Sequence, residues 1–357
     1  MKFPIRQNSR SGIALIVVMI AIFVLAMLAA VFAYSMKVET KLAQNGQSEQ
    51  QLLWLGRSGV EYARWILAQE ASIPGQPYDA LNQIWAGGPG GVAESNSILM
   101  GISLNNFQVG NGTVSLKIID LERFANINTA GTPELQQALT LMGVDADSMS
   151  VVSDSIQDWV QPGDAPRVAG AKSDYYQTLT PPYNCKDAPM DDISELLLVK
   201  GVTWAMFNGG TDPNEAPSPF HHKLGFANSP DQPPDYPFGL KDVFTPFSSG
   251  RININTADAN VLQLIPGVDT NAAAAIIQQR AGPDGVEGTD DDTPFQNVGQ
   301  LSAAGVNASQ LSQLCTVRSS TFEVHVTAQI GGYSREYIAV LYRNSGTDIR
   351  VYDFHEK

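Results

Sequence analysis

The sequence predicts an α+β protein, in which a long N-terminal helix packs on a small antiparallel sheet and a large, mostly helical domain is inserted between the strands. Three observations lead to this prediction. An apolar run near the N-terminus passes into a helical pattern, strand candidates occur before residue 121 and after residue 320, and one five-residue motif occurs twice between them. Helices and strands are recognised here by their different periods of hydrophobicity.

The N-terminal run predicts a membrane-spanning helix. Every residue of 13–33 is apolar, and no charge follows until Lys37, whereas the short leader before the run carries Lys2, Arg6 and Arg10. About 20 apolar residues are enough to cross a bilayer as a helix. Basic residues on the N-terminal side favour a cytoplasmic leader. We therefore expect a single membrane pass, with the bulk of the chain outside the cytoplasm.

Three interpretations of this segment compete: a plain anchor, a secretory signal cut near 31–33, and a processed helix that stays with the protein. The run is longer than the 7–15 residues or so that are usual in a secretory signal, which counts against removal. Gly12 lies at the junction of leader and apolar run. This arrangement looks like the class III signal of type IV pilins and pseudopilins, which a prepilin peptidase cuts after the Gly.

Helical periodicity continues beyond the membrane to Glu70, where Ile73-Pro74-Gly75 ends it. One helix over 13–70 would be roughly 90 Å long at 1.5 Å per residue. Half of it would lie in lipid and half on a soluble domain. Alternating patterns predict strands at 113–121, 321–330, 334–342 and 349–354, the second and third joined by a Gly331-Gly332 turn.

These elements divide the chain into a leader (1–12), a transmembrane part of the helix (13–36) and an α/β domain made of two separate segments (37–122 and 316–357). The inserted α-helical domain (123–315) lies between those segments. It contains an internal repeat, with copies at about 123–203 and 251–307. Asn-Ile-Asn-Thr-Ala occurs at 126–130 and again at 253–257, and both copies continue to a Gly-Val-Asp. Agreement further downstream favours duplication.

Each copy resembles a helix-hairpin-helix unit. In the first, we expect Thr132 to cap a helix that begins with Pro133. In the second, Asn255 or Thr256 would lead into a helix over 257–265, Pro266-Gly267 would break it, and a second helix would cover 272–280.

Such units are best known for binding DNA, so a membrane-anchored DNA receptor is an alternative function. The DNA-binding hairpin needs a second Gly whose backbone faces a phosphate. Here Asp145 and Asp269 occupy that position, and a carboxylate repels phosphate. The net charge of −14, from 36 acidic and 22 basic residues, also disfavours nucleic acid. We expect packing modules and no nucleic-acid partner.

An acidic loop follows the second copy and is a candidate Ca²⁺ site. Five carboxylates fall within nine residues, among glycines that permit tight turns: Asp284, Glu287, Asp290, Asp291 and Asp292. Ca²⁺ prefers such oxygen ligands. The spacing is not that of an EF-hand, and a solvated acidic loop is the alternative. The first copy has a sparser set, Asp158, Asp164 and Asp174.

Two cysteines, Cys185 and Cys315, could form a disulfide in an exported protein, or could be two buried thiols. Catalysis has little support in the sequence. His221-His222 lies in a Pro-rich loop, His325 lies within a strand candidate, and none of the usual nucleophile, phosphate-loop or zinc motifs occurs. We expect a protein that is not an enzyme.

Taken together, the motifs resemble those of the protein K family of type II secretion systems, the large minor pseudopilins. No single motif is specific, but together they cover nearly the whole chain. The residues that carry the resemblance are Gly12-Ile13-Ala14-Leu15-Ile16, Asp158-Trp159-Val160 with Pro162-Gly163-Asp164, Asp174-Tyr175-Tyr176, and segments 195–203 and 252–257.

The resemblance implies a pilin-like fold with a large helical insertion, at the tip of a periplasmic pseudopilus anchored in the inner membrane. Implied partners are the minor pseudopilins I and J, the prepilin peptidase and the inner-membrane secretion platform. The peptidase would cut between Gly12 and Ile13 and then methylate the Ile13 amine. A minor pilin of a type IV pilus is the related alternative.

One departure from pilins at large is informative. Most pilins carry Glu at the fifth mature residue, and this position is Val17 here. In lipid, the new α-amino charge of one subunit needs a partner, and the Glu of the next subunit supplies it. A subunit that enters the fibre first needs no such Glu. Val17 therefore favours a subunit that initiates or caps the fibre.

Overall fold

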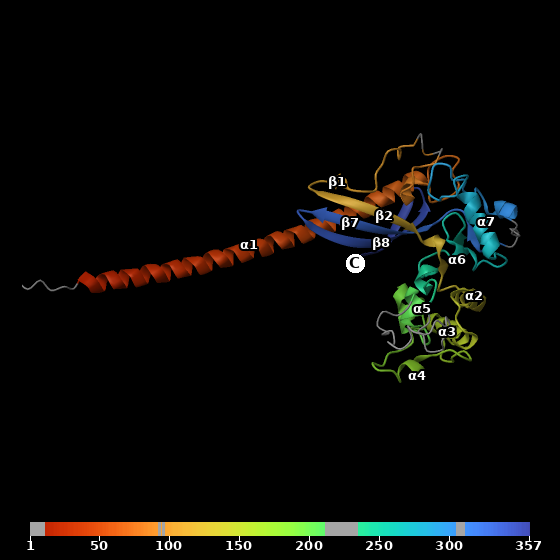
Figure 1. Ribbon diagram of the computed structural model, residues 1–357, viewed down its shortest axis with the longest axis horizontal. Helices are drawn as coiled ribbons and strands as arrows, with labels where there is room; N and C mark the ends of the chain where they lie inside the picture. Colours follow the sequence, from red (N-terminus) through yellow and green to blue (C-terminus); the bar gives the residue numbers. More distant parts are fainter. Residues whose placement is uncertain (1–10, 92–93, 95–96, 211–234, 305–310) are drawn as a thin grey trace, which may run out of the picture.

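The computed structural model of the chain describes residues 11–91, 94, 97–210, 235–304 and 311–357. The basic leader and His221-His222 lie outside these residues. Figure 1 shows a long helix that projects from a compact head, with a sheet packed on the C-terminal half of the helix and a helical domain beyond the far end of the sheet.

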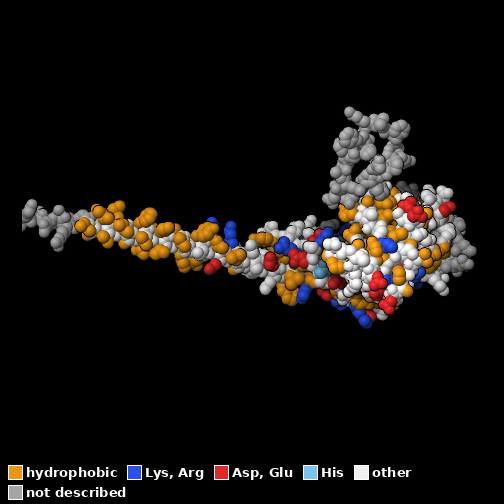
Figure 2. Space-filling view, turned by 90° about the horizontal axis from the view of Figure 1, so that it is seen from below, with side chains coloured by type: hydrophobic (Ala, Val, Ile, Leu, Met, Phe, Trp, Pro, Cys, Tyr) orange, Lys and Arg blue, Asp and Glu red, His pale blue; other side chains and the backbone are white. Residues whose placement is uncertain are grey.

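Helix α1 (Ser11–Glu70) is a single unbroken helix of 60 residues, as the periodicity predicts. Residues 13–33 of the helix are exposed and apolar, and Figure 2 shows hydrophobic side chains covering its outer part, with charged side chains only nearer the head. The second half buries one face, which includes Leu52, Val60, Ala63, Ile66 and Leu67. The helix therefore has two surroundings along its length.

The sheet has five antiparallel strands in the order β1-β2-β7-β8-β9. They are β1 (Phe107–Val109), β2 (Gly112–Asp120), β7 (Thr321–Ile330), β8 (Tyr333–Ser345) and β9 (Asp348–Glu356). The pairing of β2 with β7 joins segments about 200 residues apart. The predicted sheet, interrupted by an insertion, is therefore confirmed. The short edge strand β1 is an addition to the prediction.

Helix α1 approaches the sheet closely at Gly56 and Gly59. A Cβ atom at Gly56 would overlap the Tyr337 ring, and one at Gly59 would overlap Val326 and lie 3.0 Å from Val114 Cγ1. At Gly46, on the projecting part, a Cβ atom would meet nothing within 4 Å. The two glycines nearest the sheet thus let the helix backbone pack directly against β-branched and aromatic side chains.

The first part of the insert follows the 3-10 turn η3 (Leu121–Arg123). Its elements are β3 (Ala125–Asn126), α2 (Thr132–Met142), α3 (Ala146–Val160), α4 (Ser173–Tyr176), η4 (Ile193–Leu198) and α5 (Trp204–Asn208). Thr132 does not cap α2 as expected, because Gly131 is the cap and Thr132 is already helical. Glu134 Oε2 accepts a hydrogen bond from Gly131 N at 2.8 Å.

The second part contains η6 (Leu240–Asp242), β4 (Phe244–Thr245), β5 (Ile252–Asn253), α6 (Ala259–Leu262), α7 (Thr270–Arg280), η7 (Val298–Ala304) and β6 (Cys315–Thr316). The expected helix over 257–265 shortens to α6, since Asp258 is its cap rather than Asn255 or Thr256. Two parallel strand pairs, β3–β4 and β5–β6, hold the insert together. Strand β6 of the second pair ends at Thr316, one residue beyond the predicted end of the inserted domain at residue 315.

Two hydrophobic cores result. One lies between α1 and the sheet and includes Trp85 and Phe322. The other belongs to the insert and runs through both of its parts, from Ile127 to Cys315. Because the cores are separate, the head consists of two packed bodies joined at the ends of β2 and β7.

Candidate functional site

The joint between the insert and the sheet is a buried polar network. Asp120, the last residue of β2, accepts hydrogen bonds at Oδ2 from Asn253 Nδ2 at 3.0 Å, Thr256 Oγ1 at 2.5 Å and Ser319 Oγ at 2.7 Å. Burial raises the pKa of Asp120, and the nearby Glu122 charge raises it further, while the hydrogen bonds from Thr256 and Ser319 oppose the rise. The network therefore ties the repeated motif of the second copy to the sheet.

Glu122, in the 3-10 turn η3 directly after Asp120, also belongs to the joint. It is fully buried, and its carboxylate accepts from Ser320 N at 3.1 Å and Thr321 N at 2.9 Å, at the start of β7. It also accepts from Ser249 N at 3.3 Å, in the loop before β5. One side chain thus holds both the returning strand and the insert.

A buried ion pair lies next to this network. Arg343, on β8, pairs with Asp79, and both side chains are about 97% buried. Arg343 Nη2 also donates to Ser319 O at 2.7 Å, and its guanidinium lies 4.7 Å from the Phe322 ring centroid. A buried charge needs such partners on every side. Arg343 therefore fixes the loop after α1 to the joint.

The roles of Asp79, Asp120, Glu122 and Arg343 were not predicted from the sequence, although one signal was present. Along β8, Tyr337, Ala339 and Leu341 face the core, and Arg343 continues the same alternation. A charged residue at a core-facing position requires a buried partner of opposite charge. The identity of that partner, Asp79, depends on a contact across more than 260 residues.

The two copies of the repeat make equivalent hydrogen bonds. Asn128 accepts from Met190 N at 2.7 Å and donates to Met190 O at 3.0 Å. Asn255 accepts from Phe295 N at 2.8 Å and donates to Phe295 O at 3.0 Å. In both copies the second Asn of the motif therefore holds the segment that enters the downstream 3-10 turn.

The first Asn differs between copies. In each copy its Oδ1 accepts from the backbone two residues on, Asn128 N or Asn255 N. Asn126 Nδ2 donates to Ser248 O, whereas Asn253 Nδ2 lies within 3.1 Å of Asp79 O, Asp120 Oδ2 and Ser319 Oγ. Of these two Asn side chains, Asn253 is therefore the one that contacts the sheet.

The hairpin of each copy ends in a helix cap, which is unsuited to phosphate. Asp145 Oδ1 accepts from Asp147 N and Ser148 N at the start of α3, and Asp269 Oδ1 accepts from Ala272 N at the start of α7. These carboxylates occupy the backbone N–H groups that a DNA phosphate would need. The interpretation of the repeats as packing modules stays a prediction.

The acidic loop after α7 is held by its own hydrogen bonds. Asp284 N donates to Asp291 Oδ2 at 3.0 Å, Gly288 N donates to Asp292 Oδ2 at 2.8 Å, and Glu287 pairs with Arg280. Asp290 lies in the same turn. Among the described residues, no three His, Cys, Asp or Glu side chains are gathered as a metal-ligand set. The Ca²⁺ site therefore remains a prediction.

The first copy has a cation of its own at the matching place. Lys172 Nζ donates to Asp158 O and Gln161 O, both at 2.6 Å, and pairs with Asp187 at 2.6 Å. The Asp158 carboxylate faces Arg167 at 3.7 Å, while Asp164 and Asp174 are exposed. Lys172 thus ties the end of α3 to Asp187, and the sparser cation site of the first copy stays a prediction.

Cys185 and Cys315 are both free and buried in this structure, which corresponds to the alternative of two buried thiols. Cys185 Sγ lies 3.5 Å from Asp158 O in the first copy. Cys315 lies in β6, beside β5 of the second copy, where burial raises its pKa to about 12. Cys185 thus packs in the first copy, whereas Cys315 packs on the second copy from just beyond its end.

The N-terminal processing residues lie at the exposed start of α1. Gly12 and Ile13 are in its first turn, and Ile13 and Val17 are 70% and 59% exposed. The most apolar 18-residue window of the helix has a mean hydropathy of 3.2 and is entirely exposed. The helix is therefore compatible with a single-pass membrane anchor.

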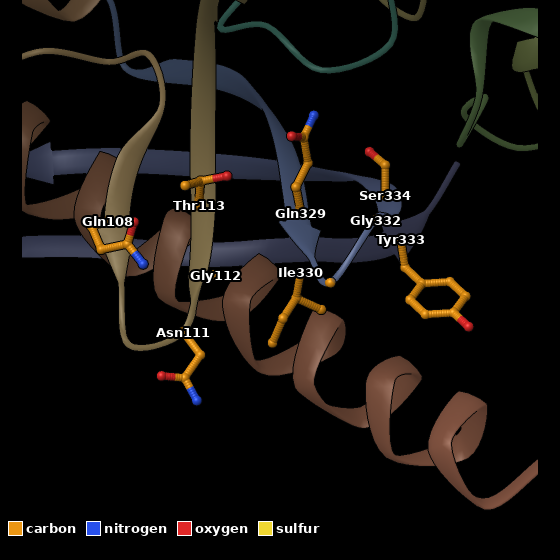
Figure 3. A pocket seen from close by; sticks show the side chains of 10 residues that line it. Gln108, Asn111, Gly112, Thr113, Gln329, Ile330, Gly332, Tyr333 and Ser334 are labelled. Carbon is orange, nitrogen blue, oxygen red and sulfur yellow. The ribbon is translucent and has the colours of Figure 1, made fainter. Parts of the chain in front are cut away.

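An open hollow of about 460 Å³ lies where the sheet meets the projecting helix. Figure 3 shows that the β1–β2 and β7–β8 turns line it, with Gln108 and Asn111 on one side and Tyr333 on the other. None of its lining residues is charged. Tyr333 Oη donates to Asn45 Oδ1 at 2.7 Å, so this end of the sheet contacts α1 beyond the core. The lining provides no catalytic set.

These features define a class of protein: a pilin-type subunit whose N-terminal helix is compatible with a membrane anchor and whose sheet carries a large inserted domain. Family models described as "Type II secretion system (T2SS), protein K" match residues 104–209 and 252–322. The chain belongs to the type II secretion system protein K family.

Relatives agree with this assignment. The type II secretion system protein K of Pectobacterium carotovorum subsp. carotovorum is 24% identical over 212 residues, which are 55% of this chain and 60% of that protein. A similar solved structure is a chain of the GspK-GspI-GspJ complex from the enterotoxigenic Escherichia coli type 2 secretion system, with a TM-score of 0.62 and 17% identity. It covers 88% of this chain and 99% of that chain. This likeness shows the fold.

Proposed function

We propose that this chain is a non-enzymatic minor pseudopilin that initiates or caps a periplasmic pseudopilus, in a complex with the minor pseudopilins I and J. The fibre would support protein export across the outer membrane. The observation that carries the proposal is the position of the insert, beyond the end of the sheet opposite the projecting helix (Figure 1). A fibre subunit stacked on that end would meet the insert.

Partners I and J are proposed by analogy with the similar complex, and α1 supplies a surface for them. Beyond the apolar run 13–33, the helix still exposes Val38, Leu42 and Trp54, at 40%, 63% and 64%. Large apolar side chains outside the bilayer indicate a surface that another protein covers. Neighbouring pilin-type helices, themselves apolar, are suited to pack there.

Co-purification of the full chain with pseudopilins I and J from detergent-solubilised membranes tests the proposal. We expect all three to elute together. Trp54→Ala should weaken the complex by about tenfold or more, since aromatic anchors dominate interfaces. Glu61→Ala, on a charged exposed side chain of the same helix, is the control and should leave the complex intact. Wild-type protein that elutes alone would contradict the proposal.

Position at the tip rests on Val17 as well. If this subunit enters the fibre first, it has no α-amine ahead to neutralise. Val17→Glu should then leave secretion unchanged or lower it, measured as exoprotein in the medium of complemented cells. A gain in secretion or fibre length on this substitution would show that the subunit occupies an internal place.

A further inference from the structure

A second polar cluster lies at the end of α1, away from the acidic loop. Glu70, the last residue of α1, is 3% exposed, and Glu94, in the loop that follows, is 1% exposed. Both lie on the part of α1 and its loop that packs on the sheet, far beyond the apolar run. Gln76, at 6% exposed, lies between them.

The two carboxylates share one donor. Gln76 Nε2 lies 3.1 Å from Glu70 Oε2 and 3.1 Å from Glu94 Oε1. Among the described ion pairs neither carboxylate has a basic partner, since the nearby Arg343 pairs with Asp79. Two carboxylates this close repel each other unless a proton or a cation lies between them. Burial, and then the Glu94 charge, raise the pKa of Glu70.

The cluster also contains oxygens without hydrogen-bond partners. Glu70 Oε1, Gln76 Oε1 and Asn82 Oδ1 are buried and have no donor. A buried oxygen left without a partner costs about 1–3 kcal/mol. The Gln76 amide group lies against both carboxylates, so its unpaired oxygen belongs to the same cluster.

The loop backbone brings the remaining groups together. Glu94 Oε2 accepts from Ile84 N at 3.2 Å, and a Cβ atom at Gly90 would lie 2.8 Å from that oxygen. A Cβ atom at Gly91 would lie 3.9 Å from both Asn82 Nδ2 and Tyr78 Oη. The backbone at Gly90 and Gly91 thus lies close to both the Glu94 carboxylate and the Asn82 amide. The half-buried Tyr78 lies beside it.

We propose that Glu70, Gln76, Asn82 and Glu94 form a Ca²⁺ site that ties the end of α1 to the three later residues of this set. The ligands would be two carboxylates and two amide oxygens, and such all-oxygen sets suit Ca²⁺. Rotation of the Gln76 amide by half a turn exchanges Nε2 with the unpaired Oε1 and directs an oxygen at the ion. The carboxylates of Glu70 and Glu94 would together neutralise the two positive charges of the Ca²⁺ ion.

If the site exists, Ca²⁺ should reverse the order of stability of the wild type and the Glu94→Gln variant. Without Ca²⁺ the wild-type cluster keeps its repulsion and its unpaired oxygens. Glu94→Gln removes one charge, so this variant should melt at or above the wild-type temperature in EGTA. With Ca²⁺ the order should reverse, because only the wild type gains binding free energy. A reversal of order is not expected from a purely structural role.

Full-length chain in detergent micelles, stripped with EGTA, is the sample for the test. Asp290, Asp291 and Asp292 are changed to Asn in every variant, so that the acidic loop does not contribute. Melting is followed by circular dichroism, Ca²⁺ binding by calorimetry, and Tb³⁺ by luminescence excited through Tyr78. Glu94→Gln and Asn82→Ala should each weaken Ca²⁺ binding by about tenfold or more, equal to about 1.4 kcal/mol. Glu61→Gln, on an exposed carboxylate, is the control and should bind as before.

Asn82→Ala keeps both carboxylates and so provides the test if Glu94→Gln does not fold. The proposal is overturned if the wild-type cluster binds no Ca²⁺ in this background. It is equally overturned if Glu94→Gln and Asn82→Ala bind Ca²⁺ as the wild type does. In either case Glu70 and Glu94 share only a proton. The test does not depend on partners or secretion, so its outcome is separate from that of the proposed function.

Discussion

Asn253 Nδ2 donates a hydrogen bond to Asp120 Oδ2 over 3.0 Å, and this contact joins the insert to the sheet. Asn253 begins the second copy of the repeated motif, and Asp120 ends β2, 133 residues earlier. The same amide reaches the backbone of Asp79 and the hydroxyl of Ser319. One side chain therefore connects the loop after α1, the sheet and the insert.

Asn253→Ala should destabilise the protein by about 2–3 kcal/mol, because it leaves a buried carboxylate and a buried carbonyl short of a donor. The measurement is the urea midpoint of full-length chain in micelles. Asn126→Ala is the matched control from the first copy, where the amide reaches only Ser248 O, and it should cost about 1 kcal/mol. Equal losses of unfolding free energy at both positions would show that the contacts of Asn253 at the joint stabilise the protein no more than the single contact of Asn126.

Gly59→Ala should loosen α1 from the sheet, because the added methyl overlaps Val326 and crowds Val114. Over-packing of this kind costs about 1–3 kcal/mol. Gly46→Ala is the control, since its methyl meets nothing within 4 Å and alanine favours a helix by about 1 kcal/mol. Thermal melting should therefore move in opposite directions for the two variants. A higher melting temperature for both variants would mean that the contact between α1 and the sheet can accommodate the added methyl group at Gly59.

The sequence was sufficient for elements whose pattern is local. The alternation in 321–330 predicted β7 with its observed bounds, and the helical pattern of α1 ends where Ile73-Pro74 follows. The three-residue strand β1 is too short to show a period. Caps were also misplaced, because Gly131 and Asp258 compete with neighbouring Thr and Asn residues that are almost as suitable.

The joint could not be predicted, because its partners come from distant segments. Asp79, Asp120 and Arg343 each look like an ordinary charged residue in sequence. Their roles depend on the loop after α1, β2 and β8 meeting in space. The repeated motif directed attention to Asn253. The place of Arg343 in the alternation of core-facing residues along β8 could have singled out that residue. Neither signal identifies the partner residue with which Asn253 or Arg343 interacts.

Stability should depend on pH through His325, on the outer face of β7. Its ring lies 2.6 Å from Glu323 and 3.2 Å from Glu336, and Lys357 also pairs with Glu336. Lys117 is its register neighbour on β2. Hydrogen bonding to Glu323, and then to Glu336, raises the pKa of His325, while partial burial opposes the rise.

A raised folded pKa means that the stabilisation is fully present below the unfolded value of about 6.5 and is lost as pH rises through the folded value. The free energy of unfolding of wild type minus His325→Gln should thus be positive, up to about 1 kcal/mol, at pH 5.5 and fall toward zero at pH 9. His355→Gln is the exposed control and should show a smaller change. A difference that grows with pH would contradict the sign.

The acidic loop should bind Ca²⁺ if its crowded carboxylates need a counter-ion. In the Glu94→Gln variant the cluster at the end of α1 binds Ca²⁺ about tenfold more weakly, so the stability gained on adding Ca²⁺ comes mainly from the acidic loop. Calcium at 100 times its dissociation constant would add about 2.7 kcal/mol to stability. Changing Asp290, Asp291 and Asp292 to Asn should abolish the gain, measured as the melting temperature in Ca²⁺ against EGTA. If Glu94→Gln melts at the same temperature in both, the loop is a solvated turn held only by its own hydrogen bonds.

Processing at Gly12 is the remaining prediction, and it decides how α1 enters a fibre. A prepilin peptidase that recognises a small residue before Ile13 should leave Gly12→Leu uncut, since a bulky side chain replaces a hydrogen at the cleaved bond. Mass spectrometry of membrane-extracted chain should find an N-methylated Ile13 as the first residue in the wild type and intact Met1 in the variant. Ser11→Ala is the control and should be processed normally. A wild-type chain that begins at Tyr34, or keeps Met1, would instead identify the segment as a secretory signal or a plain anchor.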